Sequence, residues 1–69
     1  MLDTQLTEMK AERNRLKAKI EELRTFKKSE EYIKVDAETR FLVYCQLETL
    51  NRYRAVLKRC VMKIEDKQL

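Results

Sequence analysis

The side chains best suited to chemistry with a ligand are the eight cations between residues 10 and 28. They are Lys10, Arg13, Arg15, Lys17, Lys19, Arg24, Lys27 and Lys28. Against three carboxylates, they give this segment a net charge of +5. Lysine and arginine donate charge-assisted hydrogen bonds to phosphate oxygens, so the segment is suited to bind phosphate. Charge alone favours the plainer interpretation, a solvated helix face partly neutralised by neighbouring carboxylates.

Arg13 and Lys19 stand out among these cations because each lies on or near the apolar stripe along which the segment packs. An unpaired cation in such a place is costly. A bound anion would remove that cost, which makes the two residues the more informative members of the group.

The sequence offers little for catalysis or metal binding. It has no His and no Gly, hence no Gly-rich phosphate loop, and no nucleophile paired with a base. Cys45 and Cys60 are 15 residues apart in one predicted helix. That places them about 22 Å apart, which is too far for a disulfide. We expect a binding protein, not an enzyme, that needs neither a metal nor another cofactor.

Composition indicates an all-α chain that is stable only as an oligomer. Its 69 residues include no Gly and no Pro, and 41% are charged while 43% are hydrophobic. Long helices joined by a short connection fit this composition, and so small a core usually needs partner chains. We predict a single domain over residues 1–69, an antiparallel helical hairpin with a short helical turn at its tip. No apolar run approaches the ~20 residues of a membrane span, so we expect a soluble, cytosolic protein.

The first helix is predicted from Leu2 to Lys28, with Asp3 or Thr4 as its cap. Its apolar residues alternate at spacings of four and three, the pattern of a narrow packing seam. They are Leu2, Leu6, Met9, Leu16, Ile20 and Leu23, with Arg13 at the one polar position of the series. The break falls at Lys27-Lys28-Ser29, where Ser29 is a suitable N-cap for a short turn.

The second helix is predicted from Ala37 to about Glu65, with Asp36 as its N-cap. Its apolar face covers roughly half the circumference, too wide for one partner helix with a narrow seam. The face comprises Leu50, Leu57 and Ile64 in the centre, Val43, Leu47 and Val61 beside them, and Leu42, Tyr53, Val56 and Cys60 on the other flank. We interpret Tyr53 as a core residue. Phe41 and Tyr44 point away from this face. We expect them to contact another subunit rather than to stack on a base. The excess apolar surface predicts neighbouring chains.

Several of these residues follow the pattern of a known group. It runs Leu16-x-x-Lys19-Ile20-x-x-Leu23-x-x-Phe26, then Tyr32, then Glu38 leading into Leu42, Gln46-Leu47, Leu50, Tyr53 and Leu57. The pattern resembles small bacteriophage anti-CBASS proteins, which are sponges for cyclic nucleotides. The resemblance implies a helical hexamer that binds cyclic di- and trinucleotides without cleaving them, in the host bacterial cytoplasm. It thereby implies a block of CBASS anti-phage immunity.

The same resemblance implies which residues bind the ligand. Lys19 matches the lysine of the pattern that contacts a ligand phosphate. Arg15 lies one turn earlier on the same side and is a second candidate. The pattern has a base-stacking aromatic residue near its N-terminus, and this chain has none before Phe26. Gln5 from a neighbouring chain is the candidate for that region.

Two other functions remain open from the sequence. One is a coiled-coil interaction module that binds a host protein through the exposed part of the second helix. The other is a small nucleic-acid-binding protein that uses the basic face of the first helix.

Overall fold

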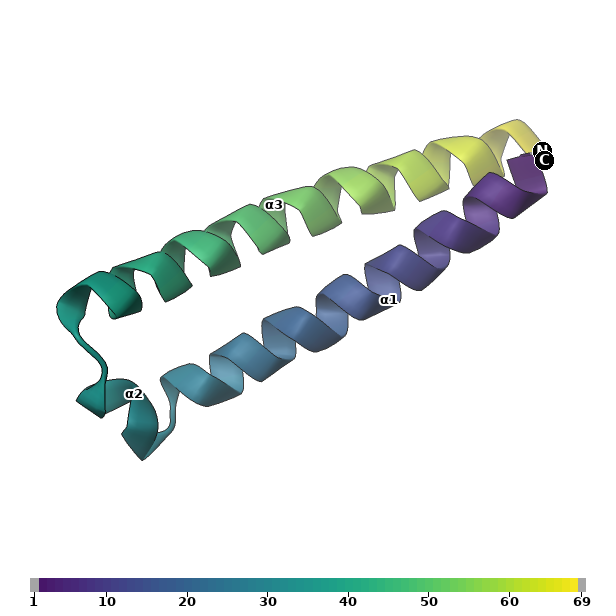
Figure 1. Cartoon of the computed structure of the whole chain (residues 1–69). Helices are drawn as coiled ribbons and strands as arrows, with labels where there is room; N and C mark the ends of the chain where they lie inside the picture. Colours follow the sequence, from purple (N-terminus) through teal and green to yellow (C-terminus); the bar gives the residue numbers. More distant parts are fainter. Residues whose placement is uncertain (1, 69) are drawn as a thin grey trace.

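The chain forms two long antiparallel helices joined by a short one (Figure 1). The computed structural model describes residues 2–68, and side chains over residues 3–66. The elements are α1 (Leu2–Lys27), α2 (Glu30–Lys34) and α3 (Ala37–Gln68). Together they make a rod of about 50 × 15 × 15 Å. The predicted all-helical hairpin is confirmed.

The helix limits differ slightly from those predicted. α1 already includes Leu2, so Asp3 and Thr4 lie within the helix and do not cap it. The Asp3 carbonyl instead accepts a hydrogen bond from the Thr7 hydroxyl at 2.9 Å. α3 continues past Glu65 to Gln68. Leu2 was predicted to pack in the seam of the first helix, but its side chain lies outside the residues whose side chains the structure describes.

The tip is closed by short-range hydrogen bonds. Ser29 caps α2: its hydroxyl accepts from the Tyr32 amide at 3.4 Å and donates to the Phe26 carbonyl at 2.6 Å. The rings of Phe26 and Tyr32 then meet edge to face, with centroids 5.6 Å apart. Such caps satisfy backbone groups that a helix end leaves unpaired, so the predicted break at Ser29 is confirmed.

Asp36 begins α3 as predicted. Its carboxylate accepts a hydrogen bond from the Thr39 amide at 3.1 Å. Hydrogen bonding with Thr39 holds the pKa of the Asp36 carboxyl below its ordinary value, because it favours the charged form. The cap thus fixes where α3 starts and, with the tip, how α3 lies along α1.

The core is a single row of side chains between the two long helices. Ile20 and Val61 are the most deeply buried, at 2% and 1% exposed. The other buried hydrophobic residues are Val43, Leu47 and Leu57. Near the tip, Ile20 packs with Val43 and Leu47. These residues come from the predicted seam of α1 and the predicted face of α3.

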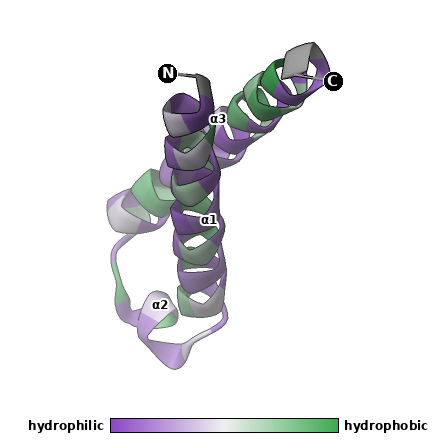
Figure 2. Ribbon diagram, turned by 90° about the vertical axis from the view of Figure 1, so that its right-hand side faces the viewer, coloured by the Kyte–Doolittle hydropathy of each residue, from purple (hydrophilic) through white to green (hydrophobic). Residues whose placement is uncertain are grey.

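Much of the wide apolar face of α3 stays exposed. Its exposed residues are Leu42, Tyr53 and Val56, and Phe41, Tyr44 and Met62 are exposed elsewhere on the same helix. Figure 2 shows apolar segments along both long helices, with α3 tilted relative to α1. The interpretation of Tyr53 as a core residue is wrong for the single hairpin, in which Tyr53 is 42% exposed.

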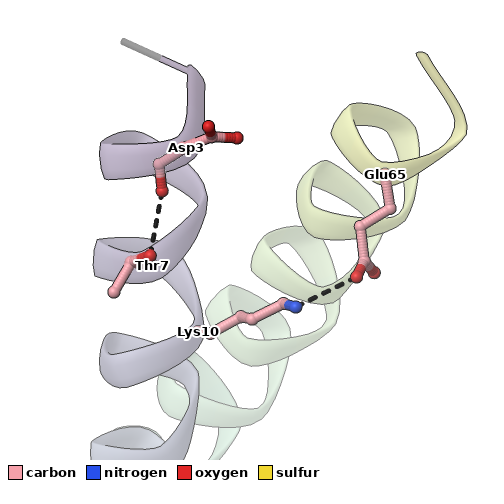
Figure 3. Close-up of polar contacts among 4 residues, drawn as sticks. All are labelled: Asp3, Thr7, Lys10 and Glu65. Carbon is pink, nitrogen blue, oxygen red and sulfur yellow. Dashed lines mark hydrogen bonds and ion pairs between the residues drawn. The ribbon is translucent and has the colours of Figure 1, made fainter. Parts of the chain in front are cut away.

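Polar contacts between Lys10 and Glu65 and between Tyr53 and Glu12 join the long helices. The ammonium of Lys10 lies 3.0 Å from the carboxylate of Glu65, near the open end of the hairpin (Figure 3). The Tyr53 hydroxyl donates to Glu12 at 2.8 Å. Neither long helix within residues 2–68 has the apolar stretch needed to cross a membrane.

Candidate functional site

Four cations from α1 and α3 line a groove of about 240 Å³ on one side of the hairpin. We call it the cationic groove, and its lining is Arg13, Asn14, Lys17, Arg54 and Lys58. On each helix the Arg and the Lys are four residues apart, which places them on the same side, one turn from each other. The antiparallel packing brings the two Arg–Lys pairs together.

No carboxylate belongs to the described lining of this groove. None of its four cations forms an ion pair with a carboxylate among residues 3–66. Arg13 and Arg54 are half-buried, whereas Lys17 and Lys58 are exposed. Arg13, the polar position in the α1 seam, therefore lines a positively charged groove.

A second groove follows on the same side, nearer the tip. This tip groove has a volume of about 400 Å³ and is lined by Arg24, Lys27, Lys28, Tyr44, Leu47, Glu48 and Asn51. Arg24 lies seven residues after Lys17, two turns further on the same side of α1. The Asn51 amide nitrogen donates to the Leu47 carbonyl at 3.0 Å, which leaves its side-chain oxygen as an acceptor.

The opposite side of the hairpin is apolar on α3. We call this surface the apolar flank: Leu42, Tyr53, Val56 and Cys60. Val56 and Lys58 are two residues apart, about 200° around the helix, so they face opposite sides. A groove of about 460 Å³ extends along the flank, lined by Met9, Val56, Arg59, Cys60, Lys63 and Ile64. Cys60 and Cys45 are free thiols.

The residues predicted to bind a ligand lie on α1 and are exposed. Lys19 and Arg15 are one turn apart, and neither forms a hydrogen bond or ion pair with a residue in the range 3–66. Lys19 is exposed and does not lie in the packing seam. It lies seven residues after Glu12, on the same side of α1. Since Glu12 contacts Tyr53, Lys19 is on the side of the apolar flank.

Gln5 is also exposed, but it does not meet Lys19 within one chain. Gln5 and Lys19 are 14 positions apart, which corresponds to about 21 Å along the helix. Sequence reasoning chose Lys19, Arg15 and Gln5, and none of them lines the grooves described above. Arg54 and Lys58 were missed, although they repeat the Arg–Lys spacing of Arg13 and Lys17.

The arrangement as a whole presents groups that bind and orient a ligand. Within residues 3–66, no group of His, Cys, Asp and Glu side chains is arranged to hold a metal ion. The unpaired cations offer charge-assisted hydrogen bonds to an anion. The exposed apolar residues offer a surface for another chain.

Comparison with known proteins identifies the family. No curated protein and no solved structure matches the chain. The family model described as Sequestin matches residues 3–59, which include α2, nearly all of α1 and most of α3. This match implies a binding or sequestering role rather than catalysis. The chain therefore belongs to the Sequestin family.

Proposed function

We propose that this protein sequesters cyclic di- or trinucleotide messengers without cleaving them, and so blocks CBASS immunity in the host bacterial cytoplasm. The sequestering class follows from the family match. The ligand class is the one that the resemblance to anti-CBASS sponges implies. The function needs tight binding and an abundant protein, and it needs no catalytic group.

The observation that carries the proposal is the position of Lys19 and Arg15. Both are exposed and lack a partner within residues 3–66. They lie on the side of the apolar flank, where a neighbouring chain would pack. A chain that covers the flank would bring its own surface close to Lys19 and enclose a pocket between chains. Small-molecule sites commonly form in such concave junctions.

The assembly is part of the proposal. We propose a homo-oligomer, with the six chains that the resemblance implies. In a symmetric assembly the same surface recurs on each chain, so two Lys19 side chains are available for the two phosphates of a cyclic dinucleotide. Gln5 of a neighbouring chain reaches the site only through this assembly.

Isothermal titration calorimetry with a panel of cyclic di- and trinucleotides tests the function. We expect tight binding, and chromatography of the ligand recovered after denaturation should show it intact. Loss of one charge-assisted hydrogen bond costs about 1.5–3 kcal/mol. Because Lys19→Ala removes two Lys19 contacts from each cyclic dinucleotide, it should weaken binding at least about 100-fold. Lys34→Ala, on α2, is the matched control and should leave affinity unchanged.

Two results would contradict this proposal. If the protein binds no member of the panel, the proposal that it sequesters cyclic nucleotides is wrong. Equal affinities for wild type and Lys19→Ala remove Lys19 from the site. In both cases the size of the assembly should be checked by light scattering, so that loss of assembly is not mistaken for loss of a contact.

A nucleic-acid-binding function is the second candidate, because the cationic groove and the tip groove lie on the same side of the rod. Binding to a polyanion should weaken steeply with salt and select little among sequences. A titration with duplex DNA at two salt concentrations separates this function from selective binding of a small nucleotide. The exposed apolar flank is also a surface on which a host protein could bind. Capture of that protein from host lysate, followed by competition with the purified partner, tests this third function.

A further inference from the structure

We propose that the cationic groove is a phosphate-binding site of its own, separate from Lys19, that takes a nucleotide with two or more phosphate groups. The nucleotide class rests on the proposed function, whereas the affinity for phosphate rests on the groove alone. The groove is formed within one chain by Arg13, Asn14, Lys17, Arg54 and Lys58. It therefore exists without a neighbouring subunit.

The first argument is the pairing of like charges. Arg13–Lys17 and Arg54–Lys58 are each four residues apart, a spacing at which like charges destabilise a helix. The antiparallel fold places the two pairs against the same groove, which adds repulsion between the helices. No described carboxylate of the lining compensates them. A bound polyanion would turn this repulsion into attraction.

The second argument is the burial of the arginines. Arg13 and Arg54 are half-buried, one from each helix, while the two lysines are exposed. Guanidinium groups bind phosphate oxygens through two parallel hydrogen bonds, and lysines add mobile point charges. The Asn14 amide adds a further donor at the edge. The groove thus offers directional donors in its interior and further charge at its rim.

The third argument is the size of the positive surface. The cationic groove has a volume of about 240 Å³ and is confined between two helices. Toward the tip, Glu48 lines the adjoining groove and interrupts the run of positive charge. A long nucleic-acid backbone would meet that carboxylate. A compact ligand with closely spaced phosphates fits within the four cations.

The tip groove could bind the base of a nucleotide whose phosphates lie in the cationic groove. Tyr44 lines it and is 51% exposed. An exposed aromatic ring is a surface on which a base can stack. Asn51 lies one turn from Arg54 on α3 and presents its side-chain oxygen as an acceptor. This position of Tyr44 favours a ligand contact over the subunit contact that the sequence favoured.

The test uses three variants with the same loss of charge. Arg54→Gln/Lys58→Gln neutralises one pair of the cationic groove. Arg59→Gln/Lys63→Gln neutralises an Arg–Lys pair of the same spacing outside that groove and is the control, whereas Arg15→Gln/Lys19→Gln neutralises the pair of the proposed function. Calorimetry with inorganic tripolyphosphate and with a cyclic dinucleotide is run on all three variants and on the wild type. Circular dichroism confirms that each variant remains helical.

We expect Arg54→Gln/Lys58→Gln to bind tripolyphosphate at least tenfold more weakly than the wild type, and the control Arg59→Gln/Lys63→Gln to bind it nearly as well as the wild type. Equal weakening in both variants would mean that general charge attracts the probe and would overturn the proposal. So would unchanged affinity in the groove variant, or no binding of tripolyphosphate by the wild type.

The cyclic dinucleotide separates the two proposals. If it does not bind while tripolyphosphate binds in the groove, the proposed function fails and the phosphate site stands. If it binds and only Arg15→Gln/Lys19→Gln weakens it, the function stands and the nucleotide assignment of the groove is overturned. If Tyr44→Leu lowers the affinity for the cyclic dinucleotide but not the affinity for tripolyphosphate, the base binds in the tip groove. Equal cyclic dinucleotide affinities for the wild type and Tyr44→Leu would overturn that part.

Discussion

The two sides of the hairpin lack different partners: one lacks carboxylates for its cations, and the other lacks a surface that covers its apolar residues. On one side, four cations line a groove without a described carboxylate. On the other, the apolar flank of α3 has no helix to cover it, and Val56 is 54% exposed. Both surfaces are unfavourable in an isolated chain, one through charge repulsion and the other through contact with water. A small anion can satisfy the first, whereas only another apolar surface satisfies the second.

The two proposals place different sites on opposite sides of a narrow rod. The rod is about 15 Å across, so the proposed site at Lys19 and the cationic groove lie close together without sharing residues. Lys19 lies on the side of the apolar flank, and Arg54 and Lys58 line the groove on the other side. Substitutions in the groove should therefore spare assembly, whereas substitutions on the flank should change assembly and the Lys19 site together.

The largest effect is expected from Val56→Glu. Its charge would fall within the proposed interface and would be costly to bury, so we expect the assembly to dissociate into single chains. Light scattering after size-exclusion chromatography measures the mass. Met62→Glu is the control, because Met62 is 55% exposed but lies one turn from Lys58 on the side of the cationic groove. Dissociation of both variants, or of neither, would show that the apolar flank does not mediate assembly.

A smaller effect is expected from Arg54→Gln/Lys58→Gln in the absence of ligand. Removing one like-charge pair should stabilise the protein by about 0.5 kcal/mol at low salt, a rise in Tm of about 2–4 °C. Thermal melting followed by circular dichroism measures it. The gain should shrink near ~1 M salt, where the screening length falls to about 3 Å. A lower Tm at every salt concentration would mean that these cations stabilise the fold.

The smallest effect concerns Tyr53, on the apolar flank. Its hydrogen bond to Glu12 raises the pKa of the phenol above its ordinary value of 10.0, because the carboxylate accepts a hydrogen bond that only the protonated phenol can donate. A raised pKa means that this contribution to stability is complete below pH 10.0 and is lost as pH rises through the folded value. Tyr53→Phe should therefore lower Tm slightly at neutral pH and not at strongly alkaline pH.

Glu12→Gln gives an independent check on that bond. Absorbance of the phenolate during an alkaline titration should show one tyrosine ionising at lower pH than in the wild type. If the titration curves of the two proteins coincide, the hydrogen bond does not persist in solution.

The local features of the fold could be predicted from sequence because each depends on neighbouring residues. Ser29 and Asp36 cap the helices that follow them through bonds to residues three positions later. The apolar seam through Ile20 follows from the spacing of apolar residues alone. The sequence also showed that Arg13 is the one polar residue in that seam. The ends of α1 and α3 differ from the predicted ones, at Lys27 and not Lys28 and at Gln68 and not Glu65, because fraying and end effects carry little sequence signal.

The cationic groove could not be predicted in the same way. It requires Arg13 and Lys17 to face Arg54 and Lys58, residues about 40 positions away along the chain. That meeting depends on how the two helices align, which the length and geometry of the tip determine. The repeated Arg–Lys spacing was present in the sequence, but the facing of the two pairs became apparent only in three dimensions. Tyr53 was misjudged for a related reason, because its burial depends on the width of the opposite helix.

The tip also influences how fast the protein becomes functional. Its hydrogen bonds join residues three positions apart, as in the two bonds of the Ser29 hydroxyl. Folds dominated by local contacts form within microseconds to milliseconds. Each chain can therefore form its hairpin and groove rapidly after release, and the proposed assembly would then stabilise them. Encounters between chains depend on concentration and would set the pace of that assembly, so a steep rise in protein synthesis would shorten the delay.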